Sequence, residues 1–205
     1  AWVGVQGLNP AVQGFTTTRL HGSSLKPYDS LNLGDHVGDD PAAVAANRER
    51  VNQWLPSPPA WIRQVHGTRA VDADLAINQP GTRADALVTT RVGQVLGILT
   101  ADCLPVVMAD ANASVLAVAH AGWRGLAAGV LEQALATMRT RQGQMGSWHA
   151  WIGPGISAKA FQVGDDVRDA FFQVNPRWVS YFTADQAPRK WRCDLPGLAR
   201  AVLLE

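Results

Sequence analysis

Three short strand-like segments followed by a helix-forming stretch are the feature that most constrains the fold. The segments are residues 84–90, 104–109 and 114–120, and the last is almost wholly apolar, as a strand covered on both faces of a sheet is. In the stretch 125–142 the apolar side chains recur at helical spacing: Leu126, Val130, Leu131, Leu135 and Met138. Strands mixed with helices predict an α/β (α+β) domain, built on a layered mixed β-sheet flanked by helices.

The rest of the chain adds further predicted elements. Strands are expected at 60–66, 95–100 and 148–152, and helices at 41–55, 165–174 and 195–203. Asp40 is expected to cap the first of these helices, with Pro41 in its first turn. Residues 14–39, rich in Gly, Ser, Asp and Asn, are expected to form an irregular loop. Since no internal repeat or linker divides the sequence, residues 1–205 are interpreted as a single domain.

Composition narrows the classes of function. Hydrophobic residues make up 47% of the chain and charged residues 17%, which is typical of a globular protein. A net charge of +1 gives no electrostatic argument for nucleic acid or a membrane surface. The two cysteines, Cys103 and Cys193, do not form a disulfide framework and favour a reducing compartment. We therefore expect a cytoplasmic protein with neither a nucleic-acid nor a membrane partner.

Three residues of metal-binding type lie where predicted strands end. They are His66, Cys103 and His120, each delivered by a different segment. Zinc accepts His nitrogen and Cys thiolate, and catalytic zinc commonly has three protein ligands and one water. The spacing contains no familiar zinc motif, so two other hypotheses stay open. Cys103 and His120 can form a metal-free nucleophilic pair oriented by Asp102, or Cys103 can be a small buried hydrophobe.

Four further polar residues are candidates for the same site. Arg124 precedes the helix predicted from residue 125, whose N-terminus favours phosphate or carboxylate, and its guanidinium adds a bidentate fork. Arg19 is a second candidate anion contact, and His36 lies in a loop of turn residues that can reach a site. Asp102 is a candidate general acid or base, or a partner of a histidine. The competing interpretation is that these are ordinary solvated or loop residues.

Seven short motifs occur in the order of one known family and span nearly the whole chain. They are 18–19 (TR), 32–39 (NLGDHVGD), 64–67 (QVHG), 84–86 (ADA), 100–105 (TADCLP), 119–125 (AHAGWRG) and 152–156 (IGPGI). Together they resemble the YfiH family, also called the laccase-domain or FAMIN-like family. The resemblance implies a fold similar to the cytotoxic necrotizing factor catalytic domain. It also implies that His66, Cys103 and His120 bind zinc, with copper as the other candidate metal.

The function implied by the resemblance is that of a purine nucleoside enzyme. Its reactions would be phosphorolysis of adenosine, inosine, guanosine and methylthioadenosine, together with adenosine deamination, so its partners would be a nucleoside and phosphate. For such an enzyme, the candidate catalytic residues among those described above are Cys103, Asp102 and Arg124. The candidate anion- or substrate-binding residues are Arg19, Arg124 and His36. Three alternatives are a peptidoglycan-precursor amidase using Cys103 or zinc, a copper-dependent polyphenol oxidase, and a zinc-stabilised module without enzymatic activity.

The sequence departs from the family pattern in two places. The family's Thr-Arg-x-Gly-Gly segment has His21 where its first glycine stands. Family members usually continue past the point where this sequence ends, with a Cys-Thr and an aromatic-Tyr-Arg-Arg segment. Residues 1–205 are therefore interpreted as a single catalytic domain that lacks a C-terminal segment usual in the family.

Overall fold

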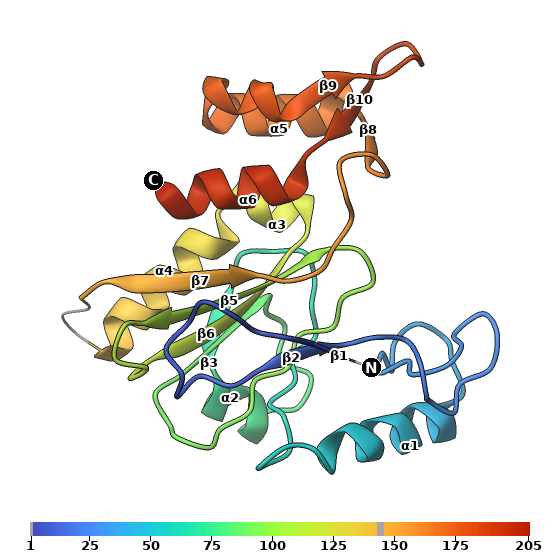
Figure 1. Ribbon diagram of the computed structural model, residues 1–205, viewed down its shortest axis with the longest axis vertical. Coiled ribbons are helices and arrows are strands. Elements are labelled where there is room, and N and C mark those ends of the chain that lie inside the picture. The colour runs from blue at the N-terminus through green and yellow to red at the C-terminus, as the bar shows by residue number, and fades with distance from the viewer. Residues whose placement is uncertain (1, 143–145) are drawn as a thin grey trace.

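The computed structural model describes residues 2–142 and 146–205, and a five-stranded mixed sheet forms its centre (Figure 1). In spatial order the strands are β3 (Ala70–Asp72), β4 (Ala86–Thr89), β6 (Leu116–Ala121), β5 (Leu104–Asp110) and β7 (Trp148–Ile152). β3 runs parallel to β4, and the other neighbouring pairs are antiparallel. The mixed sheet is confirmed, as are the strands predicted at 84–90, 104–109, 114–120 and 148–152.

Successive side chains of the central strands point to opposite faces, and each face has its own core. On one face Ala86 and Val88 of β4 join the larger apolar cluster, which also holds Ala119 of β6. On the other face Leu87 belongs to a smaller cluster, and Val118 packs against it. Because both faces are covered, the strands are apolar at nearly every position.

Helices cover the first face. α4 (Val130–Gln142) packs on β3, β4 and β6, while α6 (Leu195–Leu204) packs on β7 and α4. Beyond α6, at the top of Figure 1, lies a further layer. It contains α5 (Asp165–Val174), the 3₁₀ helix η1 (Pro176–Tyr181) and a small antiparallel sheet of β8 (Gln162–Gly164), β10 (Lys190–Cys193) and β9 (Phe182–Ala184). The layered arrangement of sheet and flanking helices is thus confirmed.

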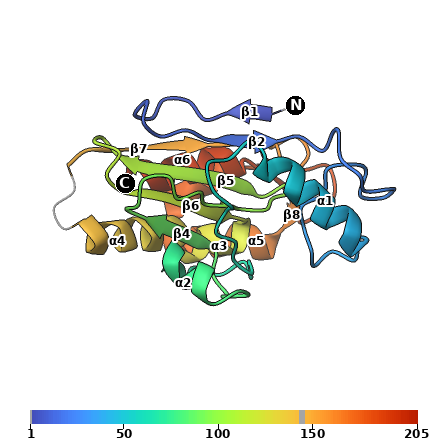
Figure 2. The ribbon, with the colours of Figure 1, turned by 90° about the horizontal axis from the view of Figure 1, so that it is seen from below.

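The remaining elements come from the first eighty residues. β1 (Trp2–Gly4) and β2 (Phe15–Thr17) pair as an antiparallel ribbon, which lies at the top of Figure 2, on the side away from α2 (Ala73–Asn78). α1 (Pro41–Asn52) starts as predicted, because the Asp40 side chain accepts a hydrogen bond from the N–H of Ala42. Within the described residues, no helix has the length and apolar character needed to span a membrane.

The strands predicted at 60–66 and 95–100 are wrong. The two segments meet at a single bridge between Ala60 and Leu96, and Arg63 makes another single bridge to Arg83. Apolar side chains from both segments nevertheless pack in the smaller core. The alternating pattern therefore reflects burial on one side of each segment, and it does not require a continuous ladder.

The single helix predicted over 125–142 is two helices. α3 (Trp123–Ala128) ends at Gly129, whose φ of 97° lies in the left-handed region, and α4 begins directly afterwards. Glycine adopts this conformation without the steric cost that other residues meet. Apolar spacing continues through the break, because both helices turn their apolar sides to the same core.

Candidate metal centre

Three neighbouring inner strands of the central sheet, β4, β6 and β5, have ends that lie side by side. The antiparallel register of β5 and β6 sets Leu104 opposite Ala121, so Cys103 lies beside the end of β6. On the other side of β6, the backbone carbonyl of Asp85 accepts a hydrogen bond of 2.8 Å from the N–H of His120. His66 approaches from the loop that precedes β3. The sheet register thus brings together residues that lie far apart in the sequence.

The three predicted ligands converge. The ligand atoms of His66, Cys103 and His120 all lie within 4.8 Å of one another. Cys103 Sγ is 3.9 Å from His66 Nε2, and the two imidazole rings stand edge to face with their centroids 4.7 Å apart. Tetrahedral zinc, with its ligands at about 2.0–2.3 Å, holds the ligand atoms roughly 3.3–3.8 Å apart. Small side-chain rotations suffice to reach this geometry, so the donor set fits zinc.

A buried carboxylate supports the ligands, and the candidate residues named from the sequence do not include it. The side chain of Asp85 is fully buried. It accepts hydrogen bonds from the N–H of His66 (2.9 Å) and Gly67 (2.7 Å), and from that of Val65 (3.2 Å). Its Oδ1 also lies 2.9 Å from His120 Nδ1. One feature of the sequence pointed to this residue: Asp85 lies at the start of the strand predicted at 84–90, and a charged residue is seldom buried there without partners.

The ionisation of Asp85 decides which nitrogen of His120 faces the ligand cluster. Burial raises the pKa of this carboxyl, but the bonds from His120 and the three backbone N–H groups outweigh burial and hold the pKa below its usual range. An ionised carboxylate only accepts hydrogen bonds, so His120 Nδ1 carries the proton. Its Nε2 lone pair is therefore free for a metal, an arrangement found at many zinc sites.

The backbone at His66 is held in an uncommon conformation. Its φ of 58° lies in the left-handed region, which costs a residue with a β-carbon about 1–2 kcal/mol. Three successive N–H groups, those of Val65, His66 and Gly67, converge on Asp85. Such a run of N–H groups forms an anion-binding concavity. The Asp85 carboxylate is the anion that offsets the strain.

Two glycines permit the close approach of α3 to the ligands. A β-carbon at Gly122 would lie 2.8 Å from Cys103 Sγ and 3.0 Å from His66 Cδ2. One at Gly125 would lie 2.8 Å from the carbonyl oxygen of Gly67. At such distances the neighbouring atoms have to shift. The small residues of the 119–125 motif therefore set the width of the site.

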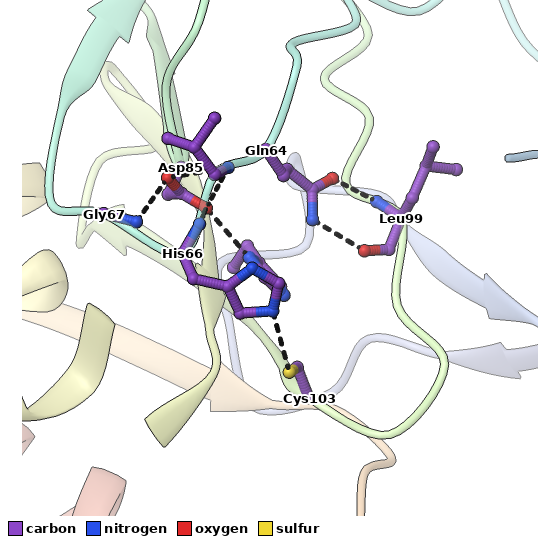
Figure 3. A network of polar contacts seen from close by, with 8 residues as sticks. Gln64, His66, Gly67, Asp85, Leu99 and Cys103 are labelled. Atoms are coloured by element: carbon purple, nitrogen blue, oxygen red, sulfur yellow. Dashed lines mark hydrogen bonds and ion pairs between the residues drawn. The ribbon is translucent and has the colours of Figure 1, made fainter. Parts of the chain in front are cut away.

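Gln64 ties the His66 loop to the segment that leads to Cys103. Its side-chain amide donates to the carbonyl of Leu99 (2.7 Å) and accepts from the N–H of Leu99 (2.8 Å), as Figure 3 shows. This pair of bonds joins the segments 60–66 and 95–100, each of which was predicted to be a strand. Cys103 follows four residues after Leu99, so the Gln64 bonds to Leu99 also restrict the position of Cys103.

The pKa values at the metal-free site oppose a free cysteine nucleophile. Burial, followed by the charge and hydrogen bond of Asp102, raises the pKa of Cys103 to about 11. Burial and the neighbouring His120 lower the pKa of His66, so its imidazole is neutral at neutral pH. A thiol protonated at neutral pH is a poor nucleophile unless a metal or a cation stabilises its thiolate. The environment of Cys103 thus opposes the metal-free Cys103–His120 pair.

Comparison with known proteins identifies the family. Residues 13–205 match the family described as multi-copper polyphenol oxidoreductase laccase. The chain belongs to this YfiH, or laccase-domain, family. It is 42% identical over 204 residues to a purine nucleoside phosphorylase of Pseudomonas aeruginosa, covering 99% of this chain and 82% of that relative. It is also 42% identical over 192 residues to purine nucleoside phosphorylase YfiH of Escherichia coli, covering 92% and 76%.

Solved structures of the YfiH family have the same fold. A Neisseria meningitidis protein assigned to the family DUF152 superposes with a TM-score of 0.91 at 41% identity, over 99% of this chain and 82% of that one. Bacillus licheniformis YfiH superposes with a TM-score of 0.85 at 28% identity, over 94% and 76%. The expected similarity to the cytotoxic necrotizing factor catalytic domain stays a prediction.

Two of the remaining YfiH-family candidates lie beside the ligands. Arg124, the second residue of α3, stacks on the ring of Trp123 at 4.5 Å, and its charge contributes to the lowered pKa of His66. Asp102 is exposed next to Cys103, and its charge acts on both Cys103 and His66. Because α3 has only six residues, the case for an anion here rests on the Arg124 guanidinium more than on a long helix dipole.

The other two YfiH-family candidates are engaged locally. Arg19 Nε donates to the carbonyl of Asp29 (2.6 Å), and its guanidinium pairs with the Asp29 carboxylate at 3.4 Å. His36 lies 3.6 Å from the Asp35 carboxylate. Among the described residues, no hydrogen bond or ion pair joins Arg19 or His36 to the three ligands. Their roles in binding an anion stay predictions.

The departure from the YfiH-family pattern falls at a residue with an uncommon backbone conformation. His21, which replaces the first glycine of Thr-Arg-x-Gly-Gly, has a φ of 70°. That value lies in the left-handed region, which glycine adopts readily and other residues adopt at some cost. His21 thus occupies a backbone conformation that glycine adopts more readily.

Proposed function

We propose that this protein is a metal-dependent purine nucleoside phosphorylase. The observation that carries the proposal is the convergence of His66, Cys103 and His120 beside an ionised, buried Asp85. Relatives 42% identical over most of the chain are named purine nucleoside phosphorylases, which supports the same reaction here. Adenosine, inosine, guanosine and methylthioadenosine are the proposed nucleosides, and adenosine deamination is a proposed second reaction. Zinc is the proposed metal, because the N/N/S donor set suits it.

Phosphorolysis exchanges one bond at the sugar for another. The bond from C1′ of the ribose to N9 of the purine breaks, and a bond from C1′ to a phosphate oxygen forms. N9 leaves with the electron pair and takes up a proton. Bound at the three ligands, zinc supplies Lewis-acid stabilisation of developing negative charge.

The protein's own residues bind and orient the reactants in this scheme. Arg124 holds the phosphate through its guanidinium fork, which matches two phosphate oxygens. Its position over the Trp123 ring restricts the side chain and directs the charge beside His66. Asp102, exposed next to Cys103, takes a proton from solvent and passes it to N9 of the leaving base. Asp85 keeps the Nε2 lone pair of His120 directed at the cluster.

The decisive assay supplies adenosine and phosphate to the zinc-loaded protein and separates the products. We expect adenine and ribose 1-phosphate to form in equal amounts and only when phosphate is present. Inosine would report the deaminase reaction.

Arg124→Ala should raise KM for phosphate by about tenfold or more, since a charged hydrogen-bonding partner is lost. Arg200→Ala, at an exposed position of α6, is the matched control and should leave KM unchanged. A zinc-loaded protein without phosphate-dependent product would refute the proposal.

The family description also raises copper oxidation as a second candidate. The chain has five histidines, and the described residues contain a single cluster of three or more metal-ligating groups. That set is too small for the usual four-copper oxidase arrangement, although copper can enter an N/N/S site. We therefore propose phosphorolysis as the function. A copper-loaded sample that oxidises a phenol faster than the zinc-loaded sample cleaves nucleosides would favour the oxidase.

The cytoplasm is the proposed location. Cys103 and Cys193 are both free thiols, which suits a reducing compartment. Residues 1–205 are proposed to act as one catalytic domain, since the residues assigned to the reaction lie on β6, on α3 and in the loops that lead into β3, β4 and β5.

A further inference from the structure

One carboxylate contacts both segments that supply histidine ligands. Asp85 precedes β4 and belongs to neither segment. Its side chain bonds the backbone around His66 and the imidazole ring of His120, while its backbone carbonyl bonds the N–H of His120. Both histidines are therefore held in place by the same residue. Asp85 lies on the protein side of the ligands, because it is fully buried whereas His66 is exposed.

For His66 the carboxylate fixes the backbone. The left-handed φ of 58° turns the N–H groups of residues 65–67 toward one spot, and Asp85 occupies it with bonds of 2.7–3.2 Å. Water has no access to Asp85, so nothing in the solvent replaces the carboxylate. A neutral amide at this position would turn a donor toward N–H groups that are themselves donors.

For His120 the carboxylate fixes the proton. The side chain of His120 is only 4% exposed, so the ring relies on protein partners for its hydrogen bonds. The bond from Nδ1 to Asp85 selects the tautomer with a free Nε2 lone pair. Without that bond, the neutral ring can carry its proton on either nitrogen, and one of the two tautomers cannot bind a metal through Nε2.

We propose that Asp85 is a positioning residue that assembles the ligand set before the metal binds. Metal affinity then depends on a side chain that is not itself one of the ligands. This inference rests on the metal site of the proposed function and extends it to how the site is formed. It requires both histidine side chains to be in position for binding in the metal-free protein. It also requires the loss of the Asp85 carboxylate to weaken metal binding more than the loss of another buried carboxylate does.

Asp110 provides an equivalent carboxylate away from the ligands. It ends β5, the strand that Cys103 precedes at its other end. Asp110 is 4% exposed and accepts bonds from the N–H of Ser114 (2.6 Å) and Val115 (2.9 Å), and from the Ser114 hydroxyl (2.6 Å). Like Asp85, it is a buried carboxylate that organises a loop. Asp110→Asn therefore controls for the general damage of such a substitution.

The first experiment measures zinc affinity by competition with a chromophoric chelator. Asp85→Asn should lose roughly 10–100-fold in affinity, the range seen when a hydrogen-bond partner of a ligand is removed. Asp110→Asn should stay within about threefold of the unsubstituted protein. Equal affinities for Asp85→Asn and the unsubstituted protein would overturn the inference, as would an equal loss in Asp110→Asn. Failure of the unsubstituted protein to bind zinc would overturn both this inference and the metal site.

The second experiment needs no substitution, so it holds even if Asp85→Asn does not fold. Nitrogen-15 NMR of the imidazole rings is recorded on the metal-free protein at neutral pH. We expect His120 to show the Nδ1–H tautomer alone. A mixture of tautomers, or the Nε2–H form, would overturn the inference. The proposed function fails separately: zinc-loaded protein that shows both expected results but no phosphorolysis would refute the reaction and leave the role of Asp85 standing.

Discussion

At the residue scale, Gly122 offers a sharp test of the site's dimensions. Its backbone has φ −68° and ψ 159°, which any residue can adopt, so Gly122→Ala changes only the space available. The added methyl would lie 2.8 Å from Cys103 Sγ and would push the thiol from its place. We expect zinc affinity to fall by tenfold or more, in keeping with disturbed ligand placement. Gly146→Ala, where a β-carbon meets nothing within 4 Å, should not change it. Equal affinities in a chelator competition would contradict the assignment.

The proton on Cys103 gives a second residue-scale prediction. Burial, with Asp102, raises the pKa of Cys103 to about 11, so below that pH the reactive thiolate falls about tenfold per pH unit. Metal-free protein should therefore react slowly with iodoacetamide at pH 8 and faster as the pH approaches 11. Asp102→Asn removes a negative charge that disfavours the thiolate. It should lower the pKa of Cys103 and speed alkylation at pH 9.

Peptide mass spectrometry separates this reaction from that of the other thiol. Cys193 is fully buried and burial raises its pKa to about 12, so it should stay unlabelled while the protein is folded. A rate at Cys103 that levels off near neutral pH would indicate a low pKa and revive the metal-free nucleophile.

Residue chemistry also explains what the sequence could predict of the site. His66, Cys103 and His120 were candidates, since few residue types bind zinc and all three lie where predicted strands end. Their spacing left metal-free alternatives open, and the family resemblance was what favoured a metal. Asp85 was not proposed, because its partners are mostly backbone N–H groups of a loop. Which N–H groups converge depends on dihedral angles, and a left-handed histidine leaves no mark in the residue pattern.

At the scale of elements, the break between α3 and α4 depends on one glycine. Gly129 has a φ of 97°, and a β-carbon there would meet only Glu132, at 3.6 Å or more. Gly129→Ala should therefore cost about 1–2 kcal/mol of unfolding free energy through backbone strain alone. Gly129→Asn should cost less, because asparagine tolerates the left-handed region better.

Urea unfolding of the two variants measures the difference, and chelator competition checks that zinc affinity is unchanged. Equal losses for alanine and asparagine would point to a steric cause and contradict the conformational one. The substitutions should change stability without changing zinc affinity, since Gly129 is not one of the three ligands and none of them lies near its position in the described residues.

Strands were predictable where both of their faces are buried and their apolar run is long. β5 has seven residues and β6 has six, and all of them are apolar except Asp110 and His120; such runs indicate central strands. β8, β9 and β10 contain three or four residues each. A period of two residues cannot be recognised in so short a segment, so the small sheet above α6 left no usable pattern. The 95–100 segment failed for another reason, since the Gln64 side chain takes the backbone groups of Leu99.

At the scale of the whole molecule, the cores and the metal centre are largely independent. The larger core contains the helix-facing residues of β4, β5 and β6 together with α4 and α6, and the smaller core lies on the opposite face. None of the three ligands belongs to either cluster. Apolar burial is the dominant stabilising term in a domain of this size. The fold should therefore persist without a metal, whereas a zinc-stabilised module would not.

Removing the metal tests this separation directly. A metal that binds only the folded state adds about 4 kcal/mol of stability when its free concentration is about 1,000 times Kd. For a chain of 205 residues, that corresponds to a drop in Tm on the order of 8–16 °C after chelation. We expect the far-ultraviolet circular dichroism at 25 °C to stay unchanged, phosphorolysis to stop, and added zinc to restore both Tm and activity. Cys103→Ser should show the lower Tm with or without chelator, because it loses the thiolate ligand. Loss of secondary structure at 25 °C on chelation would instead mean that the metal holds the fold together, and the site would then be structural.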